Sequence, residues 1–231
     1  MFLLVALAGW LGGWLLCIAS DYLPRFSASF PASSHPDWAH PPAIWRLLKT
    51  DAQRPPAGLW LQIAVEFLSA VATAVLWLRF GWSLELLLYI LGLSFFMLIA
   101  LIDLKYRLVL NIFTYPAIIM VFIAHGLTNP DSLVAIALGG ALAFSMFFLT
   151  AWLKPGELGG GDVKLATVIG VTFGFPQVLW ALMIGAGAGG IMTMGLLLSQ
   201  RGTLKTRIPY APFLCLGAVV ALFYNPLLVT I

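Results

Sequence analysis

Charged residues are scarce in this chain, and cysteine is nearly absent. Only 9% of the 231 residues are charged and 61% are hydrophobic, whereas soluble domains contain about 25% charged and 45–50% apolar residues. This composition excludes a soluble globular core. The two cysteines, Cys17 and Cys215, both lie in apolar runs, which excludes a disulfide framework and a CxxC metal site.

Several chemical motifs are also missing. The chain has no HExxH zinc-protease motif and no GxSxG nucleophile elbow, so neither of these hydrolytic mechanisms is predicted. The net charge of +3 comes from 12 Lys and Arg that lie between apolar runs. A nucleic-acid-binding face needs a basic stripe instead, so no nucleic-acid partner is predicted.

Long apolar segments dominate what remains. A transmembrane helix needs about 20 apolar residues, and the sequence predicts an all-α, polytopic transmembrane bundle of six to eight membrane segments in a single domain over 1–231. The first segment is interpreted as a span rather than a cleaved signal peptide. The sixth is too short to cross alone and is followed by Pro176, so it is either separate from the seventh or one half of a kinked span. The segments are 2–19, 58–79, 83–102, 109–126, 132–153, 163–174, 177–199 and 209–228.

The basic residues indicate an orientation. With eight spans, Arg79 is the only one of the 12 Lys and Arg on its side of the membrane, and cytoplasmic loops hold the excess of basic residues. The sequence therefore predicts a multi-pass membrane protein with a Pro-rich cytoplasmic loop at about 20–57. That loop contains His35, His40 and Asp37, but no further ligand follows at regular spacing, so no metal site is predicted.

Two aspartates lie at the predicted cytoplasmic edge. Asp103 ends the third segment and Asp162 begins the sixth, and acids are costly within a membrane. Taken alone, Asp162 is a plain helix N-cap and Asp103 a plain interfacial residue. Two carboxylates that share a proton, however, provide an acid and a base in one site, and so activate water without a metal. The pair predicts an aspartyl peptidase.

Residues next to Asp162 suit this chemistry. Gly159, Gly160 and Gly161 permit unusual backbone dihedrals and the close approach of an extended peptide. Lys164 either orients lipid headgroups or substrate acids, or simply marks the cytoplasmic side. We expect these residues to support catalysis or substrate binding.

Two further polar residues stand out. Asn111, eight residues after Asp103, is predicted to be the N-cap of the fourth segment with a supporting role only. Glu66 lies deep in the second segment, where a charge must face the bundle or a wet cavity. It either positions substrate or joins helices by hydrogen bonds.

Four stretches, in the same order, resemble the prepilin peptidases, the GxGD-type membrane aspartyl proteases of type IV pilus and type II secretion systems. They are the stretch from Asp103 to Asn111, GGGDVKL at 159–165, VEFLSAVATAVL around Glu66, and KTRIPYAPFLCLGA at 205–218. The resemblance implies that Asp103 and Asp162 are the catalytic pair. It also implies cleavage of a short basic leader after a glycine, at the cytoplasmic face of the bacterial inner membrane, with prepilins or pseudopilins as partners besides membrane lipids.

The chain departs from the family pattern in places. Many members also methylate the new N-terminus with S-adenosylmethionine and bind zinc through two CxxC pairs in a cytoplasmic loop. The loop at 20–57 has no cysteine, so zinc is not predicted, and S-adenosylmethionine is expected only if the methyltransferase activity is retained. Leu110, Tyr210 and Ala211 also replace common family residues. A non-catalytic pilin-binding scaffold and a small-solute or ion transporter are the alternative functions.

Overall fold

The computed structural model describes residues 1–26, 42–43, 58–154, 158–199 and 209–224. These residues form eight α-helices and no strand. Five helices, α1, α3, α4, α6 and α8, are long and apolar enough to cross a membrane, and α5 and α9 are shorter apolar helices. The predicted all-α, polytopic membrane fold is confirmed. The helices are α1 (Phe2–Tyr22), α3 (Leu59–Phe80), α4 (Leu84–Tyr106), α5 (Asn111–Thr128), α6 (Leu133–Leu153), α7 (Gly160–Phe173), α8 (Val178–Leu198) and α9 (Ala211–Phe223), with short 3-10 turns at Leu23–Phe26 and Pro130–Ser132.

Each predicted segment corresponds to one helix, with shifts at the ends. The helix α4 continues to Tyr106 instead of ending at 102, and α7 begins at Gly160 instead of 163. Both aspartates therefore lie inside helices. The predicted loop at 20–57 begins with helical residues up to 26, while 27–41 and 44–57, including His35 and His40, lie outside the described residues.

The chain divides into two compact units, 1–102 and 103–231. In the first unit α1 packs on α3, and glycines bring the two helices close together. A Cβ atom added at Gly9 would lie 2.8 Å from the Cβ of Thr73, and one at Gly13 would lie 2.8 Å from the Cα of Glu66. The Ser69 hydroxyl donates a 2.8 Å hydrogen bond to the Gly9 carbonyl oxygen. Small residues thus permit close helix packing, as is common in membranes.

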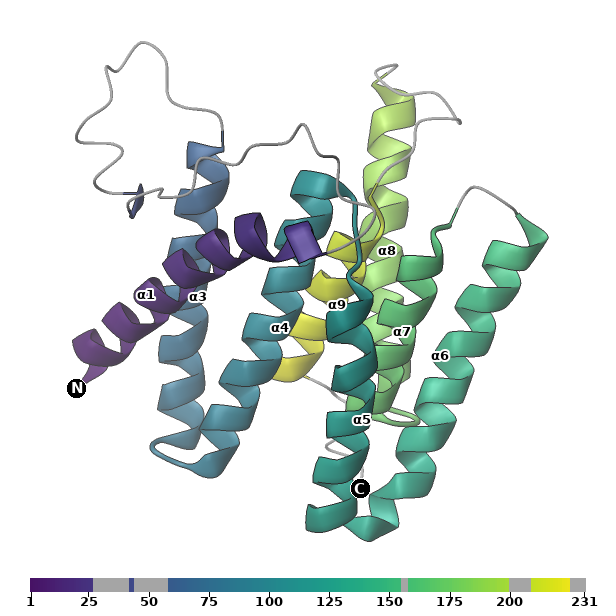
Figure 1. Cartoon of the computed structure of the whole chain (residues 1–231), viewed down its shortest axis with the longest axis horizontal. Coiled ribbons are helices and arrows are strands. Elements are labelled where there is room, and N and C mark those ends of the chain that lie inside the picture. The colour runs from purple at the N-terminus through teal and green to yellow at the C-terminus, as the bar shows by residue number, and fades with distance from the viewer. Residues whose placement is uncertain (27–41, 44–57, 155–157, 200–208, 225–231) are drawn as a thin grey trace. The chain divides into compact units, whose positions relative to one another are not determined.

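The second unit is built around α7, which contacts α5, α6, α8 and α9. Figure 1 shows α5, α7 and α9 running down the view and α6 and α8 running up it, so the first residues of α5, α7 and α9 lie at one end of this unit. The helix α7 has 14 residues, about 21 Å at 1.5 Å per residue, and is too short to cross a hydrocarbon core of about 30 Å. Its side chains Leu165, Ala166 and Ile169 are fully buried. The fold therefore holds α7 from all sides.

A turn separates α7 from α8. Gly174 has a φ of 68°, and the peptide bond between Phe175 and Pro176 is cis. The Phe175 N–H donates a 2.8 Å hydrogen bond to the carbonyl oxygen of Ala135 in α6. The sixth and seventh predicted segments are thus two antiparallel helices (Figure 1) and not one kinked span.

Candidate functional site

Asp103 lies in the last turns of α4, at the end of the second unit where α5, α7 and α9 begin. Its side chain is only 6% exposed, and the backbone N–H of Ala211 donates a hydrogen bond to its carboxyl group. Ala211 is the first residue of α9, so the positive end of that helix dipole faces the acid. The Asp103 Oδ2 atom is buried and has no hydrogen-bond partner among the described residues. A buried polar atom without a partner is uncommon and calls for an explanation.

Asp162 is the third residue of α7 and forms a reciprocal pair with Gly159. The Asp162 N–H donates to the Gly159 carbonyl oxygen at 3.0 Å, and the Gly159 N–H donates to Asp162 Oδ2 at 3.1 Å. The interpretation of Asp162 as a plain N-cap is wrong, because Gly159 holds the cap position. Burial raises the pKa of the Asp162 carboxyl, and the Gly159 N–H acts against this rise.

The structure brings the two acids together from different helices. Asp103 and Asp162 belong to the same unit, and their charges interact, as do those of Asp103 and Arg107. Two like charges in a partly desolvated site favour holding one proton between them. A pair that holds one proton in this way would provide one acid and one base.

The three glycines before Asp162 differ in what surrounds them. A Cβ atom at Gly161 would lie 2.8 Å from the Cβ of Val109, whereas one at Gly160 would meet no atom within 4 Å. Gly159 has φ −79° and ψ 148°, and none of the three has a positive φ. The prediction of unusual dihedrals is therefore wrong. Close approach is required at Gly161, where the loop before α5 packs on α7.

Asn111 does not cap α5. It is the first residue of the helix, Leu110 holds the cap position, and no side chain caps this end. The Asn111 Oδ1 atom instead accepts a 2.8 Å hydrogen bond from Lys164 Nζ, which lies 5.1 Å from the centre of the Tyr115 ring. The cap prediction is wrong because a contact with α7 engages the asparagine oxygen. Two predicted supporting residues thus join the starts of α5 and α7.

Lys164→Met is expected to reduce substrate turnover about tenfold, because hydrogen bonds to charged groups contribute about 1.5–3 kcal/mol and this one holds the first turn of α7 beside α5. Lys164→Arg keeps the positive charge and should retain most of the activity. Rates of the two variants in an assay of the activity proposed below, at matched protein concentration, check this. Equal rates for Lys164→Met and wild type would show that Lys164 has no role in the activity of the site.

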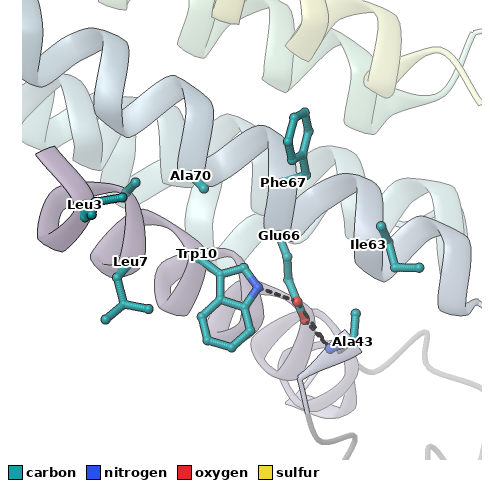
Figure 2. Close-up of a pocket in the computed structure, with 9 residues that line it drawn as sticks. Leu3, Leu7, Trp10, Ala43, Ile63, Glu66, Phe67 and Ala70 are labelled. Atoms are coloured by element: carbon teal, nitrogen blue, oxygen red, sulfur yellow. Dashed lines mark hydrogen bonds between the residues drawn. The ribbon is translucent and has the colours of Figure 1, made fainter. Parts of the chain in front are cut away.

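Glu66 lies in the first unit and is 2% exposed. Its Oε2 atom accepts a 2.8 Å hydrogen bond from Trp10 Nε1, and its Oε1 atom accepts bonds from Gln62 Nε2 at 2.8 Å and from the Ala43 N–H at 3.0 Å. Figure 2 shows Trp10 of α1 and Ala43 pointing at this carboxylate. A largely apolar cavity of about 390 Å³ lies beside it. These contacts favour the helix-joining role for Glu66 over substrate positioning.

Glu66→Gln is expected to lower the free energy of unfolding by about 1–3 kcal/mol. The substitution replaces one carboxylate oxygen by an NH₂ group, which cannot accept a hydrogen bond, so the N–H donors around it lose their acceptor. Thermal unfolding in one detergent measures this. The matched control is Glu85→Gln, the same chemical change at an exposed position in α4, which should leave the melting temperature unchanged. A Glu66→Gln melting temperature equal to that of wild type would contradict the role.

Sequence reasoning missed Val109 and Ala211 as site residues. The motif at 205–218 indicated that the segment containing Ala211 is important. Residues 205–208 of this motif lie outside the described residues. No group of three or more potential metal ligands occurs among the residues that the structure describes. The buried Cys17 and Cys215 lie on α1 and α9, far apart in sequence and in different units, so the cysteines do not fit the two CxxC pairs of zinc-binding prepilin peptidases.

Part of the chain matches a known protein family. Residues 90–194 match the model of the type IV leader peptidase family, and this range contains Asp103, Asn111 and Asp162. The prepilin leader peptidase/N-methyltransferase of Bacillus subtilis is 31% identical over 166 residues, which cover 70% of this chain and 65% of that protein. The protein of the same name from Vibrio cholerae is 30% identical over 160 residues, covering 66% of this chain and 61% of that protein.

The Escherichia coli leader peptidase HopD is 30% identical over 131 residues, which cover 53% of this chain and 83% of HopD. This chain spans less than two thirds of the length of the Bacillus and Vibrio relatives. No solved structure matches it. The matched family model and the coverage of HopD show that the chain belongs to the type IV leader peptidase family.

Proposed function

We propose that this protein is a membrane aspartyl endopeptidase that removes the leader peptide from type IV prepilins or pseudopilins at the cytoplasmic face of the bacterial inner membrane. The observation that carries the proposal is the Asp103 carboxyl group. It is more than nine-tenths buried, interacts with the charge of Asp162, and leaves Oδ2 without a partner among the described residues. A catalytic role explains why such a costly arrangement is kept.

The proposed reaction uses the two carboxyl groups as one unit. The ionised member removes a proton from a water molecule as the water oxygen bonds to the carbonyl carbon of the scissile peptide. The protonated member donates a hydrogen bond to the carbonyl oxygen as the C=O double bond opens. When the C–N bond breaks, the carboxyl group that took the proton from water passes a proton to the nitrogen, which leaves as the new amine, and the acyl group becomes a carboxylic acid. No proton is gained or lost overall, and no metal takes part in these steps.

The unpartnered Oδ2 atom of Asp103 suits this role. This atom is buried and forms no hydrogen bond with a described residue, so its capacity to bond to a proton or a reacting group is unused, while the Ala211 N–H holds the carboxyl group from one side. Asp162 is fixed in a similar way by the Gly159 N–H. Carboxyl groups that backbone N–H groups hold in place in this way are preorganised for reaction.

The proposed orientation of the site toward the cytoplasm rests on the distribution of basic residues. The end of the second unit that holds the two acids also holds Lys105, Arg107, Lys154 and Lys164, and basic residues concentrate on the cytoplasmic side of membrane proteins. This supports a site that faces the cytoplasm, where a prepilin leader precedes its hydrophobic segment. The names of the relatives from Bacillus subtilis and Vibrio cholerae support prepilins as the substrate class.

Coexpression with a prepilin in a bacterial host that lacks a prepilin peptidase tests the proposal. The expected result is a pilin shortened by its leader, with the new N-terminus identified by mass. The same spectrum shows whether a methyl group has been added. A properly inserted protein that binds several prepilins and cuts none of them would support the scaffold alternative. One that neither binds nor cuts them would direct attention to transport.

A further inference from the structure

Lys164 holds a positive charge in a fixed place at the start of α7. Its Nζ atom donates a 2.8 Å hydrogen bond to Asn111 Oδ1 and lies 5.1 Å from the centre of the Tyr115 ring. No described carboxylate forms an ion pair with it. Asp162 stands two residues earlier in α7, which is about 200° around the helix, so it faces a different side. The ammonium group therefore has no counter-ion among the described residues.

A second donor group lies beside this ammonium. Because Asn111 Oδ1 accepts the bond from Lys164, the Nδ2 atom occupies the other branch of the amide, and its two N–H groups are unused by that contact. No described residue accepts a hydrogen bond from Nδ2, and Asn111 is exposed. The ammonium has two further N–H groups of its own. The starts of α5 and α7 thus present neighbouring donors and one positive charge, which suits a ligand with anionic oxygens.

An apolar face of α5 begins next to these donors. Three isoleucines and a tyrosine recur along it at spacings of three and four, so they lie on one side of the helix, and each is more than half exposed. The face consists of Ile112, Tyr115, Ile119 and Ile123. From its first to its last residue is 11 positions, about 16 Å at 1.5 Å per residue. This is about half of a hydrocarbon core of about 30 Å, so the face matches the depth of one leaflet.

A phospholipid combines both requirements in one molecule. Its phosphate oxygens are negatively charged and accept hydrogen bonds, and its acyl chains fill one leaflet. A peptide held at the two acids lies on a different side of α7, because Asp162 does not face the way Lys164 does. Further basic residues at the same end of the second unit favour a lipid with a net negative charge over a zwitterionic one. They are Lys105, Arg107 and Lys154.

We propose that this part of the second unit is a binding site for an anionic phospholipid. Lys164 and Asn111 bind its phosphate group, and one acyl chain lies along the apolar face of α5. The bound lipid holds the starts of α5 and α7 at the membrane edge, next to Asp162 in the first turn of α7. Of the roles considered for Lys164, this is the lipid-headgroup role. The site does not depend on the proposed peptidase function, so lipid binding can be tested without any cleavage.

Native mass spectrometry of the delipidated protein, titrated with phosphatidylglycerol in a neutral detergent, tests the proposal. About 0.5 M ammonium acetate screens long-range attraction between charges. We expect wild type to bind one lipid tightly. Asn111→Asp keeps an oxygen for Lys164 but removes the N–H groups and adds a negative charge, so the affinity should fall about tenfold or more. Equal affinities of wild type and Asn111→Asp would overturn the proposal.

A matched pair of variants separates this site from a general attraction to basic residues. Lys164→Met should lower the affinity about tenfold or more, because it removes a direct contact. Lys105→Met is the same chemical change at the same end of the unit and should lower it less than threefold, since a distant charge is screened. Equal losses in the two variants would overturn the proposal. Displacement of the lipid by millimolar inorganic phosphate, or by a prepilin, would assign the donors to a free anion or a substrate acid and overturn it as well.

Discussion

Asp103→Asn and Asp162→Asn are each expected to lower leader cleavage by about 10³-fold or more, since losing one member of a catalytic unit typically costs this much. An asparagine side chain has nearly the same shape as aspartate but neither accepts nor releases a proton at neutral pH. In both variants the side-chain oxygen still accepts its present bond, from Ala211 in one case and Gly159 in the other. The loss should therefore be chemical and not structural.

Stability separates this result from misfolding. Each substitution lowers the number of ionisable carboxyl groups in this partly desolvated site from two to one, so the free energy of unfolding should stay the same or rise. Melting temperatures in the same detergent as the cleavage assay measure this. A variant that loses activity together with several degrees of melting temperature would point to a structural role for that aspartate.

Gly161→Ala is expected to have the second largest effect, a loss of cleavage of about 10²-fold, because small displacements of catalytic groups have costs of that size. The new Cβ atom would lie 2.8 Å from the Cβ of Val109, which forces the start of α7 away from the loop that follows Asp103. Overpacking of this kind also lowers the free energy of unfolding by about 1–3 kcal/mol. Cleavage rate and melting temperature are measured together.

Two further variants make this prediction specific. Gly160→Ala should keep the wild-type melting temperature, because its Cβ would meet no atom within 4 Å. Val109→Gly removes the atom that Gly161→Ala would strike, so the double variant should recover part of the lost cleavage. If the double variant is worse than the product of the single effects, the contact between Val109 and Gly161 does not position the site.

The helices were predictable because their signal is strong. Eight apolar runs separated by polar or proline-containing stretches correspond to eight helices among the described residues. The ends were less predictable: α4 extends through Asp103 to Tyr106, since polar residues can continue a helix beyond the apolar run. The division of the chain into two units has no such signal, because every segment is similarly apolar.

The two aspartates could be proposed as site residues from the sequence, since acids at the ends of apolar segments are costly and the glycines before Asp162 are unusual. The contacts between helices could not be predicted. Asn111 and Lys164 are 53 residues apart, and only folding shows that they form a hydrogen bond. The prediction that Asn111 caps α5 rested on the preference of asparagine for helix caps. It was wrong, since Leu110, which is 5% exposed, takes the cap position.

The contacts of the glycine triplet were not predictable from the sequence either. The sequence GGG presents three equivalent residues, yet Gly161 is packed against Val109 and Gly160 is open. Such a difference depends on the neighbouring loop and not on the triplet. The hydrogen bond from Ala211 to Asp103 likewise joins residues more than a hundred positions apart, so a motif at 205–218 indicated that the segment mattered but not what it contacts.

The central claim is that Asp103 and Asp162 act as one peptidase unit, and a comparison of four proteins tests it most directly. Leader removal from a prepilin is measured for wild type, Asp103→Asn, Asp162→Asn and the double variant. Because members of one catalytic unit are not additive, we predict that each single variant cleaves about 10³-fold more slowly than wild type or worse, and that the double variant is no slower than the slower single variant. Substantial cleavage by either single variant, or losses that multiply in the double variant, would contradict the claim.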